Sequence, residues 1–114
     1  MEYDWGIPMP GDWVPENLRT STHCARLPLG AITPEALFHR TRPWVLDLGC
    51  GNGRAVIVHA LQHPEIDHLA IDLFPGAIRH ASRRANRRGL TNLLFAVADA
   101  RELLPRVPAQ RVQE

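Results

Sequence analysis

Lysine is absent from this chain of 114 residues, and its 13 basic side chains are all arginine, against 12 acidic ones. The formal net charge of +1 therefore points to no class of charged partner. Cysteine is scarce as well, since the sequence holds only Cys24 and Cys50. Two cysteines exclude a disulfide framework and favour a reducing, cytoplasmic location.

Long apolar runs are also missing. No stretch is long enough to cross a bilayer, so we expect no membrane partner. The N-terminus is acidic and aromatic and does not lead from basic residues into an apolar run, which argues against a signal peptide.

Prolines and glycines divide the chain into three parts. They interrupt residues 1–33 throughout, so we expect an irregular segment whose Trp5 and Trp13 pack on the rest. Thr33-Pro34-Glu35 has the composition of a helix start, which predicts a short helix from Pro34 to Arg40. Residues 34–104 are expected to form the ordered domain, and residues 105–114 a tail.

Three apolar runs alternate with helical patterns in the ordered part. Strands are predicted at Trp44–Leu48, His68–Asp72 and Leu93–Val97. Helices are predicted at Arg54–His63 and at Pro75–Arg88, with Gly89 as a C-terminal cap and a last turn at Arg101–Leu104. Right-handed crossovers place such strands side by side in the order 3-2-1, as in one half of a doubly wound α/β sheet.

The segment most informative about function is Asp47-Leu48-Gly49-Cys50-Gly51-Asn52-Gly53, which joins the end of the first strand to the first long helix. Glycines let a ligand approach the backbone, and the helix directs its free N–H groups at the same point. The G-x-G-x-G spacing differs from the dinucleotide pattern, because Arg54 stands where the last glycine would be.

Acidic side chains stand at the ends of all three predicted strands. Asp47 needs a partner because burying an unpaired carboxylate is costly, and a ligand ammonium would serve. Asp72 can accept two hydrogen bonds from a ribose diol, and Asp99 can accept one from an adenine amino group. The three acids are therefore expected to share the ligand-binding edge of the sheet.

With these motifs, the stretch from Trp44 to Leu104 resembles the class I S-adenosylmethionine-dependent methyltransferases. The segments His63-Pro64-Glu65-Ile66, Pro75-Gly76, Arg88-Gly89-Leu90-Thr91-Asn92-Leu93 and Ala98-Asp99-Ala100 make it most similar to the bacterial tRNA (guanine-N7)-methyltransferases. The resemblance implies a Rossmann-like fold, S-adenosyl-L-methionine as cofactor, and a binding set of Asp47, Gly49, Gly51, Asp72, Leu73, Asp99 and Ala100.

Two departures from that family matter. Asp47 and Asp72 stand where the family often has glutamate, and its aromatic-proline-aspartate-proline-tryptophan segment is missing. We therefore expect an incomplete fold that binds the cofactor and does not methylate tRNA by itself, and we assign no catalytic residue. A ribosomal RNA or small-molecule methyltransferase, a non-functional cofactor-binding fragment and a non-methylating regulator stay open as alternatives.

Two further clusters carry weaker predictions. The second long helix carries arginines that are a candidate tRNA-binding face and equally a solvated outer face: Arg79, Arg83, Arg84, Arg87 and Arg88. His59 and His63 are four residues apart, but nothing completes a metal site, so surface histidines are favoured. The edge of the first strand is expected to stay unpaired and to promote self-association.

Overall fold

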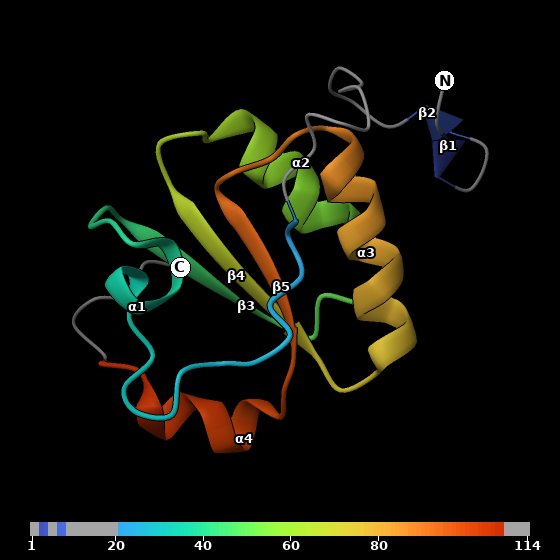
Figure 1. Cartoon of the computed structure of the whole chain (residues 1–114). Coiled ribbons are helices and arrows are strands. Elements are labelled where there is room, and N and C mark those ends of the chain that lie inside the picture. The colour runs from blue at the N-terminus through green and yellow to red at the C-terminus, as the bar shows by residue number, and fades with distance from the viewer. Residues whose placement is uncertain (1–2, 5–6, 9–20, 109–114) are drawn as a thin grey trace.

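The computed structural model describes residues 3–4, 7–8 and 21–108. Its centre is a parallel sheet of β3 (Trp44–Leu48), β4 (Asp67–Asp72) and β5 (Leu93–Val97), in the order β3-β4-β5 (Figure 1). In the register, Leu46 lies beside Leu69, and Leu69 beside Leu94. The α/β class and the strand order predicted from the sequence are therefore confirmed.

Two helices cover one face of the sheet (Figure 1). These are α2 (Arg54–Gln62) and α3 (Pro75–Arg87), which follow β3 and β4 as right-handed crossovers require. Their apolar positions pack with the strands in one core cluster: Val56, Ile57, Ala60, Ala70, Ile78, Ala81, Ala85, Leu90, Leu93 and Phe95. Gly89, with a φ of 65°, follows α3, as the sequence predicts for a C-terminal cap.

The opposite face is covered by α1 (Pro34–Phe38), α4 (Ala100–Leu103) and the 3₁₀ turn η2 (Leu104–Arg106). A second core cluster fills this side: Ile32, Trp44, Leu69, Ile71, Ala96 and Leu103. Thr33 caps α1 as predicted, because its hydroxyl accepts from Ala36 N. The prediction that α1 reaches Arg40 was wrong, since His39 takes the left-handed conformation with a φ of 59° and ends the helix at Phe38.

The segment before α1 contributes to the fold. Cys24 N donates to Phe95 O, and Phe95 N donates to Thr22 O, so residues 22–24 run alongside β5 and cover its edge. Thr22 is buried and its hydroxyl bonds to Ser82 on α3. Further upstream, β1 (Tyr3–Asp4) pairs antiparallel with β2 (Ile7–Pro8), while Trp5 and Trp13 lie outside the described residues.

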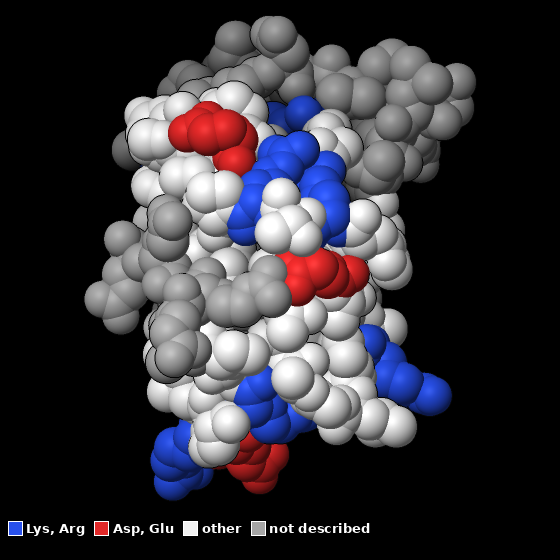
Figure 2. All heavy atoms as spheres, turned by 90° about the vertical axis from the view of Figure 1, so that its left-hand side faces the viewer, with Lys and Arg blue, Asp and Glu red and all other residues white. Residues whose placement is uncertain are grey.

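A buried carboxylate holds the amino end of the sheet together. Asp67 is completely buried at the start of β4 and accepts hydrogen bonds from Nε and Nη2 of Arg40. Arg42 lies 3.9 Å from the same carboxylate. The loop between α1 and β3 is therefore tied to the sheet by charge. Figure 2 faces this side of the molecule and shows one group of basic side chains next to acidic ones, with further basic side chains lower down.

Asn92 closes the same end of the molecule. Its side-chain amide is buried and lies within hydrogen-bonding distance of the carbonyl oxygens of Ala60, His63 and Ile66. It thereby satisfies backbone acceptors at and just beyond the C-terminus of α2. None of the helices in the described ranges is long and apolar enough to cross a membrane.

Candidate ligand-binding site

The loop from β3 to α2 is bent by its glycines. Gly49, Gly51 and Gly53 all have positive φ, at 79°, 56° and 78°, which L-residues rarely adopt. A Cβ on Gly49 or Gly51 would meet nothing within 4 Å, so the backbone there is open to a ligand. This openness supports the predicted use of these two glycines.

Gly53 has a different reason to be glycine. A Cβ at this position would lie 2.5 Å from the Cβ of Ala81 and 3.1 Å from Cζ of Phe95. The third glycine therefore lets α3 and β5 approach the start of α2, which is the packing role that the last glycine has in the dinucleotide pattern. The predicted binding set contains Gly49 and Gly51 and does not include Gly53.

Cys50 lies between the open glycines and is not a nucleophile. Its burial, together with the nearby carboxylates of Asp47 and Asp72, raises the pKa of the thiol to about 12. The side chain packs against the core cluster under α2 and α3. At neutral pH it is a protonated thiol, whereas a reactive cysteine needs the thiolate.

Asp72, at the end of β4, faces the glycine loop as predicted. Its Oδ2 accepts from Gly51 N at 3.0 Å, and its Oδ1 accepts from Phe74 N at 3.0 Å. A carboxylate has about four acceptor positions. Two positions therefore remain for a ligand while the other two fix the loop and the start of α3.

Asp99, just past β5, caps α4. Its Oδ1 accepts from Arg101 N at 2.9 Å, and its Oδ2 lies 2.9 Å from Nη2 of Arg101. The Arg101 guanidinium lowers the pKa of Asp99, so this carboxylate stays ionised at neutral pH. Asp99 is thus the cap of α4 and the ion-pair partner of Arg101. It also lines a pocket at the strand ends.

A pocket of about 340 Å³ lies where the strands end. It gathers five of the seven predicted site residues, namely Gly49, Asp72, Leu73, Asp99 and Ala100, together with four apolar neighbours: Leu48, Ile71, Phe74 and Ala98. Gly51 does not line it directly but donates to Asp72. We call this space the strand-end pocket.

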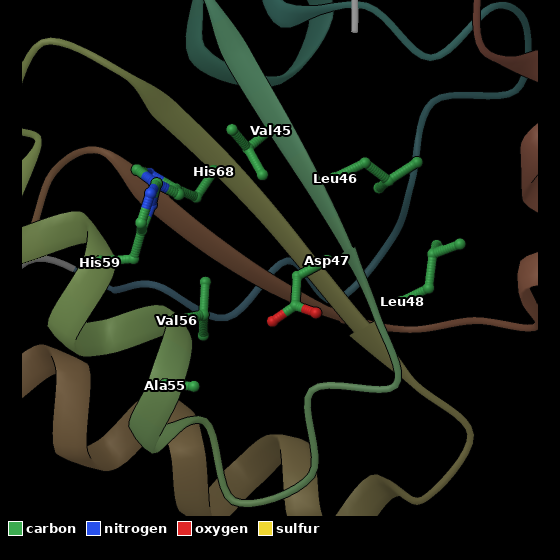
Figure 3. A pocket seen from close by; sticks show the side chains of 8 residues that line it. All are labelled: Val45, Leu46, Asp47, Leu48, Ala55, Val56, His59 and His68. Carbon is green, nitrogen blue, oxygen red and sulfur yellow. The ribbon is translucent and has the colours of Figure 1, made fainter. Parts of the chain in front are cut away.

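Asp47 lies in a second pocket, of about 520 Å³, between β3 and α2. Figure 3 shows its carboxylate on the same side of β3 as Val45, directed towards Val56 and Ala55, whereas Leu46 and Leu48 point to the opposite side. In the described part of the chain no group donates a hydrogen bond to it. Burial raises the pKa of Asp47, with His68 and His59 acting in the opposite direction.

His59 meets His68 in this second pocket, a pairing that sequence reasoning missed (Figure 3). Nδ1 of His59 is 2.7 Å from Nε2 of His68, and Nδ1 of His68 is 3.1 Å from the carbonyl oxygen of Asn92. Since that carbonyl can only accept, His68 carries its proton on Nδ1 and accepts from His59. Burial lowers the pKa of His68 and keeps it neutral. Within the described residues, no group of three potential ligands could hold a metal ion.

The predicted arginine face on α3 is smaller than expected. Arg84 and Arg88 are each only 6% exposed, so their inclusion in a surface for RNA was wrong. Nη1 of Arg84 donates to the carbonyl oxygen of Asn52 at 3.0 Å, which fixes the glycine loop from behind. Arg84 and Arg88 each follow an inward-facing alanine, Ala81 or Ala85, by three residues. Residues three apart share a helix face, so the sequence already indicated this burial.

The comparison with known families decides the class. Residues 43–112, more than half of the chain, match the profile of a family described as a methyltransferase domain. The chain belongs to this methyltransferase-domain family. The match includes all three strands of the sheet, the glycine loop and the strand-end acids.

The curated proteins with sequences similar to this chain include tRNA (guanine-N(7)-)-methyltransferases. The tRNA (guanine-N(7)-)-methyltransferase of Chloroflexus aggregans is 36% identical over 86 residues, which is 75% of this chain and 38% of that protein. That of Rubrobacter xylanophilus is 40% identical over 80 residues, or 70% of this chain and 35% of that protein. The chain thus spans little more than a third of these relatives.

Among solved structures, a plantazolicin methyltransferase in complex with a triazolic desmethylPZN analog and SAH aligns with a TM-score of 0.48 and 26% identity. The alignment covers 65% of this methyltransferase-domain chain and 26% of the other.

Proposed function

We propose that this chain is the S-adenosyl-L-methionine-binding part of a tRNA (guanine-N7)-methyltransferase. The observation that carries the proposal is the strand-end pocket, where an open glycine backbone and the carboxylates of Asp72 and Asp99 meet in a methyltransferase-family domain. The similarity to tRNA (guanine-N(7)-)-methyltransferases supports the choice of guanine N7 in tRNA as the target.

The donors and acceptors of the pocket fit an adenosine moiety. Asp72 has spare acceptor positions for the two ribose hydroxyls, and Asp99 with the backbone of Ala100 suits the adenine edge. Leu73 is 58% exposed in the same pocket and offers an apolar contact to the ring.

The glycine loop and Asp47 suit the amino-acid end of the cofactor. Gly49 and Gly51 leave room for close approach. At the N-terminus of α2 the N-cap Gly53 makes no side-chain cap and Asn52 Oδ1 accepts from Arg54 N, so the remaining N–H groups and the positive dipole end would face the cofactor carboxylate. Asp47 would accept from the ammonium, which would give its half-buried charge the partner it otherwise lacks.

The chemistry needs little from these side chains beyond placement. S-adenosylmethionine supplies a methyl group on a positively charged sulfur, and guanine N7 carries an available lone pair. No general base is required, so the contribution of the protein is to hold the two groups in line. In the described part of the chain, Asp72 and the glycine loop, which Gly51 N joins by a hydrogen bond, would hold the methyl donor.

We place the surface for tRNA on α3. Of the five arginines named from the sequence, it keeps only those that reach solvent. Arg79 and Arg83 are exposed and Arg87 is half-buried, all on one face at four-residue spacing. Such a face can neutralise successive phosphates. A tRNA substrate and two free cysteines favour a cytoplasmic location.

Self-association through β3 is the remaining proposal. Among the described strands β3 pairs with β4 alone, so its other edge presents unpaired backbone groups. An antiparallel pairing of two copies would satisfy them, and gel filtration at increasing concentration would show the shift from monomer to dimer. A monomer at every concentration would contradict this proposal alone.

Isothermal calorimetry tests the cofactor. We expect the chain to bind S-adenosylhomocysteine and S-adenosylmethionine but not NAD, because the third dinucleotide glycine is replaced by Arg54. Binding of NAD with no response to either methionine nucleoside would overturn the proposal.

Transfer of labelled methyl groups then separates the alternatives. Label in N7-methylguanine of tRNA supports the proposed substrate, and label in ribosomal RNA or a small molecule replaces it. Cofactor binding without transfer to any of them favours a non-methylating binder.

A further inference from the structure

Exposed apolar side chains gather at the mouth of the strand-end pocket. Of the large hydrophobic residues that the described part of the chain exposes, three line this pocket: Leu48, Leu73 and Phe74. Phe74 is the most exposed of the three, at 70%. An exposed aromatic ring beside a binding pocket adds nothing to the core, which points to a contact with a ligand or partner.

Two hydrogen bonds fix the backbone of Phe74. Its N–H donates to Oδ1 of Asp72 and its carbonyl oxygen accepts from Ile78 N at 3.2 Å. The residue is the N-cap of α3, directly before Pro75. The ring is therefore presented from a rigid position between the pocket and the helix.

Positive charge begins one turn further along the same helix. Arg79 and Arg83 are exposed, α3 contains no acidic residue, and within the described ranges neither arginine has an ion-pair partner. Nη2 of Arg79 lies 4.0 Å from where a Cβ of Gly76 would be, so its guanidinium reaches back towards the start of α3. Phe74 and Arg79 thus border the same end of the helix.

The charges of the pocket decide what this pair would bind. Asp72 and Asp99 line the pocket and would repel a phosphate, whereas an uncharged base can lie on Phe74 at the mouth, outside the space assigned to adenosine. Aromatic rings stack bases, and arginines next to them bind the backbone of an unpaired nucleotide. The arrangement fits a nucleotide whose base faces the pocket and whose phosphate lies on the helix.

We propose that Phe74 is a stacking platform for a base of the RNA substrate and that Arg79 binds an adjoining phosphate. This inference rests on the proposed function and adds the residues that position the substrate. It assigns Phe74 to the RNA and not to the cofactor.

The test measures two affinities in parallel. Binding of an unmodified tRNA transcript is followed by fluorescence anisotropy with saturating S-adenosylhomocysteine, and binding of S-adenosylhomocysteine alone by calorimetry. Phe74→Ala should weaken tRNA binding roughly tenfold, the effect of losing one stacked base, and leave the nucleoside affinity unchanged. Phe74→Tyr keeps an aromatic ring and should bind tRNA as tightly as the unaltered chain.

Matched variants separate stacking from general surface effects. Leu29→Ala removes a side chain that is 97% exposed and does not line the strand-end pocket, so it should change neither affinity. Arg79→Gln should weaken tRNA binding and lower the slope of log K against log salt by about one, while Arg79→Lys keeps that slope.

Three results would overturn the inference. Phe74→Ala could weaken nucleoside binding and spare tRNA, which would place the ring on the cofactor. It could change neither affinity, which would leave the ring without a role in binding. The unaltered chain could bind S-adenosylhomocysteine but no tRNA, which would remove the substrate surface and leave the cofactor proposal standing.

Discussion

At the amino end of the sheet Asp67 is completely buried and bound by Arg40 and Arg42, whereas at the carboxyl end Asp47 is half-buried and receives no hydrogen bond from the described residues. Both acids belong to neighbouring parallel strands, only a few residues apart in register. The first is part of the fold, and its charge is already compensated. The second keeps an uncompensated charge, which costs stability until a cation arrives.

The same contrast extends to the surroundings. At the amino end Asn92 and the arginines satisfy backbone and side-chain groups of the protein itself. At the carboxyl end Gly49, Gly51, Asp72 and Asp99 leave open backbone and spare acceptors. We infer that the amino end maintains the structure and the carboxyl end is kept ready for a ligand, and each prediction below tests one side of this comparison.

The largest effect is expected from Asp67→Asn. Loss of this charge leaves two arginines without their partner, and breaking a buried ion pair costs about 3–5 kcal/mol. Because both arginines are about one-third exposed, we expect the lower part of that range. Denaturant unfolding measures it, and a loss below about 1 kcal/mol would show that Asp67 does not hold the amino end together.

Two glycine variants test which part of the carboxyl end is structural. Gly53→Ala should cost about 3 kcal/mol, because it combines a left-handed conformation with a Cβ that collides with Ala81. Gly49→Ala has the same conformational penalty but open space, so about 1 kcal/mol is expected. Equal losses in thermal or denaturant unfolding would contradict the assignment of Gly53 to packing and Gly49 to the ligand.

Asp72→Ala should weaken binding of S-adenosylhomocysteine by about 1.5–3 kcal/mol, the range for hydrogen bonds to a charged group. The variant also loses the contacts to Gly51 N and Phe74 N, so a modest loss of stability accompanies it. Asp72→Asn, which keeps one oxygen acceptor, is the control and should lose less affinity. Unchanged affinity in a folded Asp72→Ala variant would remove Asp72 from the site.

The smallest effect is expected from Asp47→Asn, and this variant should gain stability where the others lose stability or affinity. The pKa of Asp47 is raised in the folded state, so its ionised form costs stability once the pH exceeds the unfolded value of about 3.9. The variant should match the unaltered protein near pH 4 and melt a few degrees higher at pH 7, while it binds the methionine nucleosides more weakly. A lower melting temperature at pH 7 would mean that Asp47 has a stabilising partner in the protein.

The sequence by itself determined the sheet, the glycine loop and the acids at the strand ends. Trp44–Leu48 and Leu93–Val97 were predicted with the bounds that the structure has, because apolar runs between turn residues are local patterns. Parallel strands end at one edge, so Asp72 and Asp99 had to meet wherever the sheet formed.

Only the tertiary structure decided which side each polar group faces and what it meets there. Arg84 and Arg88 turned inwards because α3 packs its Ala81–Ala85 face on the sheet, and His68 met His59 because β4 lies under α2. Asp47 lies beside Ala70 in the register and lines the pocket between β3 and α2, whereas Asp72 is held at the strand-end pocket by hydrogen bonds from Gly51 N and Phe74 N. Contacts of this kind join residues far apart in the chain, and no local pattern encodes them.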